Sequence, residues 1–380
     1  MVIGVTLLDL SYYQREWSIK AWFIILSGVF SYPLGVLLDT YLNRNKVYEK
    51  IPFLKNNMNL LNKKIAFRQV IYVGFFLYFA AYLLEWKIEG FLPLFTVFRE
   101  TQRHDFGVFG LHVLVSILPV LLLLIFEFLL LHNHRLLSKI GYISIFLIGL
   151  ISYLFLLNRL FLLMLGFMIL IVLHYLRRRI NVKVVVIAIL IFSFAFWGVG
   201  ELRTTQFIGN FVYNVSNMKY SDEYANYTGP YMYIAMNLEN VANGVDKLRN
   251  HHYGANVLDW MYALMGLQES LNEYLGVDKH QYLVTKAFTT MSYMWYMYAD
   301  FGLLGVILGS FFWGQLMSRL YNKMRAKPSL RLINLYSILT FIVFLSFFTF
   351  MPSMLNTVFQ VIALTMLTGY IENPSVFKQG

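Results

Sequence analysis

The chain has no cysteine, and charged residues make up only 13% of its 380 residues. The first absence excludes disulfide bonds, thiol catalysis and metal sites built on thiolates. The charged fraction is far below the roughly 25% of an ordinary soluble domain. Hydrophobic residues make up 58% of the chain. No linker rich in glycine, serine or proline and no internal repeat interrupts the sequence. These absences exclude a soluble protein and indicate one membrane domain over residues 1–380.

Motifs of nucleotide, metal and nucleophile chemistry are also missing. The sequence has no phosphate-cradling glycine loop, no nucleophile elbow and no metal-ligand spacing. We interpret His251, His252 and His280 as isolated loop histidines without a nearby pattern of carboxylates. The net charge of +11 is spread loop by loop, as membrane topology requires, and does not indicate a nucleic-acid partner. We expect no metal and no other cofactor.

Long apolar runs dominate what is present, each near the roughly 20 residues that cross a bilayer. Backbone groups in lipid must be hydrogen-bonded within the segment, so these runs are predicted to be helices. The predicted fold class is an all-α polytopic membrane protein with about nine transmembrane helices and one large external loop containing short helices. The nine predicted spans are 20–38, 65–84, 110–131, 140–157, 160–176, 184–199, 295–318, 332–350 and 354–371.

Basic residues indicate which side of the membrane each segment occupies. They concentrate in 39–64, 132–139, 177–183 and 319–331, which places these segments in the cytoplasm by the positive-inside rule. The large loop, residues 200–294 between the sixth and seventh spans, is then outside. The N-terminus is also outside and the C-terminus inside. The first ten residues are apolar but too short to span, and we expect an interfacial helix or the remnant of a further span.

Asn158 and Arg159 form the only break in an apolar stretch from 140 to 176. Both ends of this stretch carry cytoplasmic markers, so the chain must turn at Asn158 and Arg159 on the outer side. A guanidinium held at the edge of the lipid is costly and indicates a function or a partner. We predict that Arg159 binds an anion. The alternative is a snorkelling arginine that only marks the turn.

Further arginines are predicted in the same outer layer. Arg203 and Glu201 follow the sixth span, and Arg159 with Arg203 would suit a diphosphate, because the planar guanidinium forms paired bonds with phosphate oxygens. The alternative is a simple ion pair between Glu201 and Arg203 at the rim. The loop after the second span adds Arg99 and Arg103. They lie four residues apart on one face of an amphipathic segment and are further candidates for phosphate contact.

Tyrosine is concentrated between Gly200 and Asp300, where 13 of the 27 tyrosines lie. The flat ring and the hydroxyl can stack on sugars and hydrogen-bond their edges, while part of the set belongs to an interfacial aromatic belt. We predict that this region binds carbohydrate. The residues predicted to contact sugar are Tyr227, Tyr231, Tyr233 and Tyr293.

Five segments stand out along the chain: 90–95 (GFLPLF), Asn158 with Arg159, 200–203 (GELR), 229–233 (GPYMY) and the pair 289–293 (TTMSY) and 298–305 (YADFGLLG). In this order they resemble the Wzy-type polymerases of O-antigen and capsular repeat units, membrane proteins of the glycosyltransferase C class. The last segment is the most specific. Two departures are the absent or vestigial first span and the residues Phe288, Thr289 and Thr290, which replace the asparagine, tyrosine and threonine pattern of the family.

The resemblance implies a block transfer on the outer face of the bacterial cytoplasmic membrane. The growing chain on undecaprenyl diphosphate moves to the non-reducing end of one lipid-linked repeat unit, and undecaprenyl diphosphate leaves. The arginines named above would stabilise the leaving group, and Glu201 or Asp300 would be the base. Asp300 has a second interpretation as a helix cap. The implied partners are lipid-linked oligosaccharides, membrane lipids, a chain-length regulator and a flippase.

Three alternatives are open. An O-antigen ligase of the same superfamily would share the external loop and the arginines. A transporter or flippase is the second alternative, and the sequence argues against it because it shows no repeats and no broken central helices. Glu127 is the only acid well inside a predicted span and lies close enough to its inner end to snorkel. A membrane scaffold for a polysaccharide complex is the third.

Overall fold

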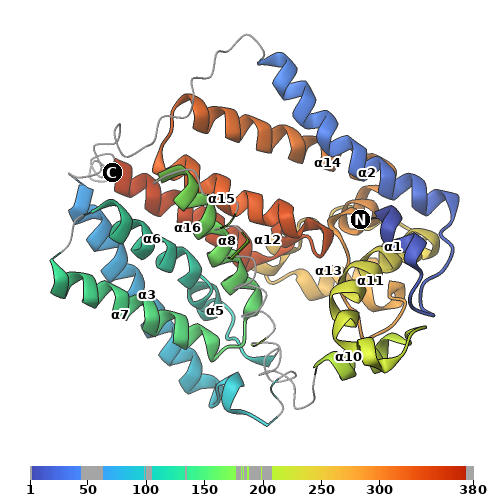
Figure 1. Ribbon diagram of the computed structural model, residues 1–380, viewed down its shortest axis with the longest axis horizontal. Helices are drawn as coiled ribbons and strands as arrows, with labels where there is room; N and C mark the ends of the chain where they lie inside the picture. Colours follow the sequence, from blue (N-terminus) through green and yellow to red (C-terminus); the bar gives the residue numbers. More distant parts are fainter. Residues whose placement is uncertain are drawn as a thin grey trace. The chain divides into compact units, whose positions relative to one another are not determined.

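The structure of the chain is a computed structural model that describes residues 2–43, 63–97, 99, 105–132, 135–176, 181, 183, 186, 187, 198 and 208–373 (Figure 1). The regular structure of these residues is helical, apart from one isolated β-bridge between Ser11 and Met218. The chain divides into two compact units. Unit 1 contains Met1–Val47, Gln206–Tyr321 and Ile342–Val358, and unit 2 contains Tyr48–Thr205, Asn322–Phe341 and Phe359–Gly380.

Seven helices within the described residues are long and apolar enough to cross a membrane, so a multi-pass, all-helical protein is confirmed. Each overlaps one predicted span. The predicted span 184–199 lies mostly outside the described residues, and 354–371 corresponds to α16 (Leu355–Glu372), which is not among the seven. The number nine therefore stays a prediction. The seven are Ile19–Leu42 (α2), Lys64–Glu89 (α3), Leu111–Leu131 (α5 and α6), Leu136–Leu154 (α7), Arg159–Leu176 (α8), Tyr293–Ala326 (α14) and Leu330–Phe347 (α15 and η6).

Unit 2 is built around α6 (Leu118–Leu131), in which every side chain from Leu118 to Ile125 is buried. A helix that is apolar on all faces belongs at the centre of a bundle. It packs against α3, α7 and α8, and Figure 1 shows α3, α6 and α7 side by side. A Cβ added to Gly149 of α7 would touch Leu122 of α6 and Phe75 of α3 at 3.1 and 3.2 Å. The three helices thus meet at this glycine.

Glu127 is buried in unit 2 and does not snorkel, so that expectation is wrong. The Glu127 side chain is fully buried, and Asn334 of α15 (Leu330–Phe344) donates from Nδ2 to its Oε2 at 3.1 Å. An acid within a membrane helix needs such a partner on a neighbouring helix. A hydrogen bond of this kind contributes roughly 0.6–2 kcal/mol to helix association.

The helix α14 (Tyr293–Ala326) reverses direction at Gly302, where φ is 64° and ψ is −153°. The hydroxyl of Tyr293 lies 2.8 Å from Oγ of Ser310, although a continuous helix would place residues this far apart about 25 Å from each other. Residues 293–301 therefore fold back on residues 303–326 as a helical hairpin. The predicted span 295–318 lies within the candidate span Tyr293–Ala326, but its first residues precede the reversal at Gly302.

Residues 294–299 lie in the hydrophobic core of unit 1, together with residues of α2, α11 (Ala225–Lys247) and the straight part of α14. A Cβ added to Gly244 of α11 would lie 2.3 Å from the Trp295 ring. One added to Gly28 of α2 would lie 3.0 Å from Sδ of Met294. The two glycines thus make room for the large side chains of the folded-back helix. Trp295 itself is 1% exposed.

The helices α2 and α14 contact each other through backbone atoms. A Cβ added to Gly35 of α2 would lie 2.0 Å from the carbonyl oxygen of Phe311, and one added to Gly314 of α14 would lie 2.1 Å from that of Tyr32. Only glycine fits at either position without moving a helix. Small residues serve in this way where membrane helices approach closely, because dispersion contacts, and not water exclusion, hold them together.

The predicted loop region is largely helical and belongs to unit 1. Short helices were expected there, but α11 has 23 residues, and most of its second half is buried. It packs against α2 and α10, so the region is part of the core of the unit. Its position outside the cell stays a prediction. Its elements are α10 (Ile208–Ser216), η4 (Asp222–Tyr224), α11, α12 (Asp259–Leu264), α13 (Gln268–Leu275) and η5 (Lys279–Tyr282). Outside this region, η7 (Met351–Ser353) precedes α16.

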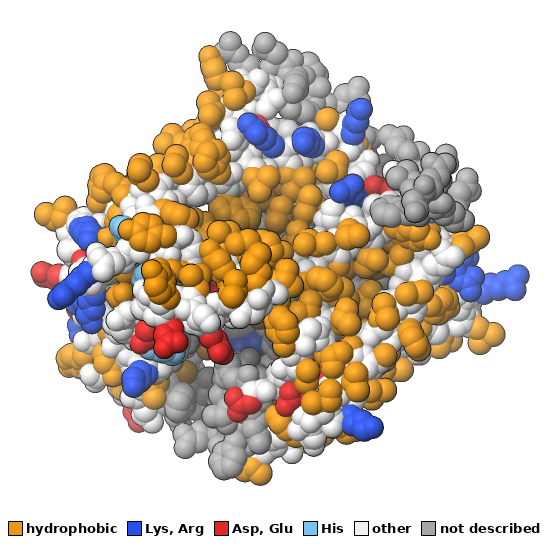
Figure 2. Space-filling model, turned by 180° about the vertical axis from the view of Figure 1, so that it is seen from behind, with side chains coloured by type: hydrophobic (Ala, Val, Ile, Leu, Met, Phe, Trp, Pro, Cys, Tyr) orange, Lys and Arg blue, Asp and Glu red, His pale blue; other side chains and the backbone are white. Residues whose placement is uncertain are grey.

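Hydrophobic side chains also cover much of the surface, as Figure 2 shows for one face. Exposed examples on the apolar helices are Phe30 of α2, Phe76 of α3 and Leu137 of α7. Soluble monomers rarely expose extensive apolar surface. These side chains are therefore expected to contact lipid.

Candidate functional site

The predicted turn at Asn158 and Arg159 is present in unit 2. α7 ends at Leu154 and α8 begins at Arg159, and Leu157 has a φ of 54° in the tight turn between them. Arg159 is partly buried at the first position of α8. The start of a helix carries partial positive charge from its backbone N–H groups. Arg159 and the start of α8 therefore present positive charge together, as an anion-binding site requires.

The segment 90–95 meets this turn. The backbone N–H of Leu94, in the 3₁₀ helix η3 (Pro93–Phe95), donates to the carbonyl of Phe155 at 3.0 Å. The rings of Phe95 and Phe155 are 5.1 Å apart. Arg99 follows this segment and is partly buried. The structure thus brings the chain segment that leads to Arg99 and the turn that leads to Arg159 to the same end of unit 2.

A carboxylate and an imidazole form a pair at this end of unit 2. Nδ1 of His112, at the start of α5 (Leu111–Val115), lies 3.1 Å from Oε1 and 3.4 Å from Oε2 of Glu85 in α3. The backbone N–H of Val108 donates to Oε1 of Glu85 at 2.9 Å. The pair is not evident in the sequence, because 26 residues separate its members. An acid in the last turns of an apolar span, followed by a histidine at the next span, was the available signal.

Three predicted site residues, Arg103, Glu201 and Arg203, lie outside the described residues. The pairing of Arg159 with Arg203 and the role of Glu201 as base stay predictions.

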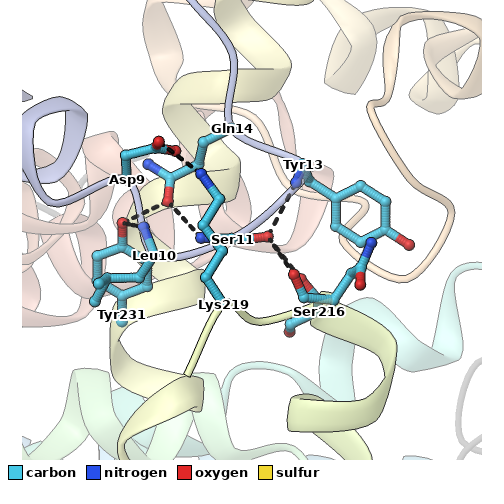
Figure 3. Close-up of polar contacts among 9 residues, drawn as sticks. Asp9, Leu10, Ser11, Tyr13, Gln14, Ser216, Lys219 and Tyr231 are labelled. Carbon is cyan, nitrogen blue, oxygen red and sulfur yellow. Dashed lines mark hydrogen bonds and ion pairs between the residues drawn. The ribbon is translucent and has the colours of Figure 1, made fainter. Parts of the chain in front are cut away.

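Residues 9–18 follow the short helix α1 (Val2–Leu8) and make polar contacts with α10, α11 and the turn between them (Figure 3). We call this segment the polar clasp. Ser11 donates from Oγ to the carbonyl of Ser216 at 2.6 Å, and Lys219 pairs with the carboxylate of Asp9 at 2.6 Å. The hydroxyl of Tyr231 accepts a hydrogen bond from the backbone of Leu10 at 3.2 Å and donates to Gln14. Tyr231 therefore takes part in fixing the clasp.

The four tyrosines predicted to bind sugar differ in where their rings lie. Tyr231 bonds to the clasp, the hydroxyl of Tyr293 bonds within the hairpin of α14, and the ring of Tyr233 packs 5.7 Å from that of Phe348. Tyr227 is 72% exposed. These positions favour packing roles for the first three. Tyr227 is the one of the four that offers a free aromatic face to a carbohydrate.

Asp300, predicted as a base or a helix cap, anchors the loop before α12. Its Oδ2 accepts a hydrogen bond from the backbone of Val257 at 2.7 Å, and its Oδ1 accepts one from Nδ2 of Asn256 at 2.7 Å. The same Nδ2 lies 2.9 Å from Nδ1 of His252. Asn256 thus links His252 to Asp300. Both oxygens of Asp300 are engaged and the residue is 1% exposed, which favours anchoring over proton transfer.

Buried asparagines of α11 hold the segment that leads into the hairpin. Asn240 donates to the carbonyl oxygens of Phe288 and Thr290 at 2.9 and 3.0 Å, and Asn243 donates to that of Tyr282 at 2.6 Å. Buried polar groups need hydrogen-bond partners. These bonds therefore hold residues 282–290 in position against α11. The segment thereby enters the core of unit 1 alongside α11.

Glu239 of α11 lies beneath the clasp. Trp17 donates from Nε1 to its Oε1 at 2.9 Å, and its Oε2 is buried without a hydrogen-bond partner among the described residues. Burial raises the pKa of Glu239 to about 7, against the opposing effects of the Trp17 hydrogen bond and the nearby Arg15. The clasp thus covers a carboxyl group that changes its charge near neutral pH.

We expect Glu239→Gln to raise stability above neutral pH. The pKa of Glu239 in the folded protein exceeds its ordinary 4.5, so the native state binds the proton more tightly than the unfolded chain. This stabilisation is fully present below about pH 4.5 and is lost as the pH rises through about 7. The difference corresponds to about 3 kcal/mol.

Melting curves in detergent across this pH range would measure the effect. Glutamine still offers an oxygen to Trp17. It does not ionise, so the melting temperature of the variant should depend less on pH than that of the wild type. Glu223→Gln, at an exposed position, is the matched control and should follow the wild type. Identical pH dependence in the wild type and Glu239→Gln would contradict the assignment.

No protein-family model matches the chain, and neither a curated protein nor a solved structure matches it. Function must therefore be argued from the residues and their geometry.

Proposed function

We propose that the protein is a membrane glycosyltransferase that joins oligosaccharide repeat units carried on undecaprenyl diphosphate. The contact between Leu94 and Phe155 carries the proposal, because it brings 90–95 and the turn before Arg159 together. These segments are far apart in sequence, and both contribute to the resemblance to repeat-unit polymerases. A cationic side chain, Arg99 or Arg159, follows each of them.

The proposed reaction is a displacement at the anomeric carbon of the growing chain. A hydroxyl oxygen of the acceptor sugar bonds to that carbon, and the bond from the carbon to the diphosphate oxygen breaks. The electron pair leaves with undecaprenyl diphosphate, and the hydroxyl proton passes to a base. Arg159 and Arg99, with Arg203 and Arg103, would donate charge-assisted hydrogen bonds to the departing diphosphate. In unit 1, the exposed ring of Tyr227 is the proposed carbohydrate contact.

This function places the protein in the bacterial cytoplasmic membrane, with the arginines and the region 200–294 on the outer side. Lipid-linked oligosaccharides are its substrates. A flippase that supplies them and a regulator of chain length are its proposed partners.

Arg159→Ala is expected to abolish polymerisation without preventing membrane insertion. Loss of one preorganised donor to a developing anion lowers the rate by about 10²–10³-fold. The measurement is a gel of surface polysaccharide from a host lacking the gene, complemented with wild type or variant at equal membrane abundance. Arg135→Ala is the control, because Arg135 is exposed at the opposite end of α7 from the turn.

The expected result is a long-chain ladder with wild type and Arg135→Ala, and a single-repeat band with Arg159→Ala. A normal ladder with Arg159→Ala would contradict the assignment of Arg159 to a diphosphate-binding site. In the deletion strain, loss of even the single repeat would indicate a flippase or a ligase. An unchanged ladder in that strain would exclude the polymerase, the flippase and the ligase.

Two observations give weight to the transporter alternative. The sequence predicts no broken central helix, which argues against a transporter. In the structure, however, α14 reverses at Gly302. Glu127 and Asn334 also form a buried polar pair within unit 2. Transporters use both features to bind substrates or ions inside the membrane. The single-repeat band in the experiment above distinguishes the two functions.

A further inference from the structure

We infer that Glu85 and His112 form a proton-transfer pair, in which His112 accepts the proton of the attacking sugar hydroxyl. The inference rests on the proposed function and names the base of that reaction. His112 would be the catalytic residue, and Glu85 would position it.

The proposed role requires the free electron pair of His112 to lie on Nε2. In this arrangement Nδ1 of His112, 3.1 Å from Oε1 of Glu85, donates to the carboxylate, which as an ionised group only accepts hydrogen bonds. Nε2 then holds the free electron pair. The Glu85 side chain is 0% exposed and that of His112 is 28% exposed. The carboxylate thus lies on the buried side of the imidazole, and the ring is accessible from elsewhere.

The imidazole is also held by its other neighbours. A Cβ added to Gly107 would lie 3.2 Å from Nδ1 and Cγ of His112, so the backbone of Gly107 packs close to the ring. The ring of Phe106 meets that of His112 edge-on, with centroids 6.4 Å apart. The carboxylate of Glu89 accepts a long hydrogen bond from the backbone of Gly107 at 3.4 Å. A base held in one orientation before the substrate arrives avoids reorganisation during the reaction.

The pair and the arginine segments share one end of unit 2. The ring of Phe106 lies 5.8 Å from that of Phe91, at the beginning of the segment 90–95. At the other end of this segment, Phe95 contacts Phe155 in the turn before Arg159. The segment therefore runs between the His112 side and the Arg159 side. Such an arrangement suits a substrate whose diphosphate lies at the arginines.

In the proposed step, the hydroxyl proton moves to Nε2 of His112 as the oxygen bonds to the anomeric carbon. The bond from that carbon to the diphosphate oxygen breaks, and its electron pair leaves on undecaprenyl diphosphate. The imidazolium formed is stabilised by the charge of Glu85. It then releases the proton to water, which restores the neutral imidazole.

The test uses full-length protein in nanodiscs and lipid-linked repeat units extracted from the host that lacks this gene. Polymerisation is followed as a function of pH and of substrate concentration. His112→Ala is expected to lower kcat by about 10²–10⁴-fold, with little change in KM. Added imidazole should restore part of the rate. The acidic limb of the pH–rate profile, which protonation of an imidazole causes, should be lost in the variant.

Glu85→Gln tests the positioning role, because glutamine still accepts the hydrogen bond of Val108 but carries no charge. It should lower kcat less than His112→Ala does, while melting curves show that the protein remains folded. His174→Ala is the matched control, since His174 lies in the last turn of α8, away from Arg159. It should behave as the wild type.

Wild-type rates and pH profile in His112→Ala would overturn the inference and leave the proposed function intact. A loss of rate that imidazole does not restore, with the acidic limb still present, would also overturn it and leave only a packing role. If the wild type makes no polymer in this assay, the proposed function fails and the inference fails with it.

Discussion

Replacement of Gly302 with alanine is expected to destabilise unit 1 by about 1–3 kcal/mol or more. Its φ of 64° and ψ of −153° lie in a region that is essentially restricted to glycine. An added Cβ would also lie 3.1 Å from Nε2 of His251. The backbone cannot relax toward a continuous helix, because that would move Tyr293 about 25 Å from Ser310.

Thermal unfolding in detergent measures this effect, with Gly141→Ala as the control. Gly141 is a helical residue of α7, and an added methyl group there would meet open space, so alanine should be neutral or slightly stabilising. Equal melting temperatures for Gly302→Ala and the wild type would show that α14 does not reverse at this residue.

Gly35→Ala is expected to separate α2 from α14. The new methyl carbon would lie 2.0 Å from the carbonyl oxygen of Phe311, which is backbone and cannot rotate away. One of the helices must shift, and overpacking of this kind costs about 1–3 kcal/mol and occasionally more. Gly314→Ala should act similarly, because its methyl carbon would lie 2.1 Å from the carbonyl oxygen of Tyr32.

Gly28→Ala is the matched control on α2. Its nearest neighbours, both at 3.0 Å, are Sδ of Met294 and Cγ1 of Val306. Both are side-chain atoms, and the methionine side chain is flexible, whereas the backbone atom that faces Gly35 is not. The expected order of melting temperatures is therefore wild type, then Gly28→Ala, then Gly35→Ala. A Gly35→Ala protein that is as stable as Gly28→Ala would contradict backbone contact between the two helices.

The hairpin of α14 bears on the interpretation of its motif. The resemblance placed residues 298–305 at the start of a span, with Asp300 as a base or a cap. In the structure Asp300 anchors the loop before α12, and Gly302 allows the chain to reverse. Both residues are explained by the architecture of unit 1. A role in building the hairpin therefore accounts for this segment without assigning it a step in the chemistry.

The candidate site was only partly predictable from sequence. The turn at Arg159 was predictable because basic residues at both ends of one apolar stretch leave only one way to cross the membrane twice. The partners of Glu85 and Asp300 were not predictable, since the two acids are bonded to segments 23 and 43 or more residues away along the chain. Tyr231 and Tyr293 were predicted to bind sugar because they lie in a tyrosine-rich region. The composition of that region does not show which group each hydroxyl contacts, and in the structure both hydroxyls bond within unit 1.

The sequence by itself determined that this is an all-helical membrane protein, where most apolar helices lie and where the α7–α8 turn occurs. Hydrophobic run length and charge position suffice for this, because the cost of exposing backbone or burying charge in lipid is local to each segment. Only the tertiary structure decided that α14 folds back, that Glu127 is buried and that Glu85 meets His112. These features depend on which side chains from distant segments fill the same space, and no local pattern records that.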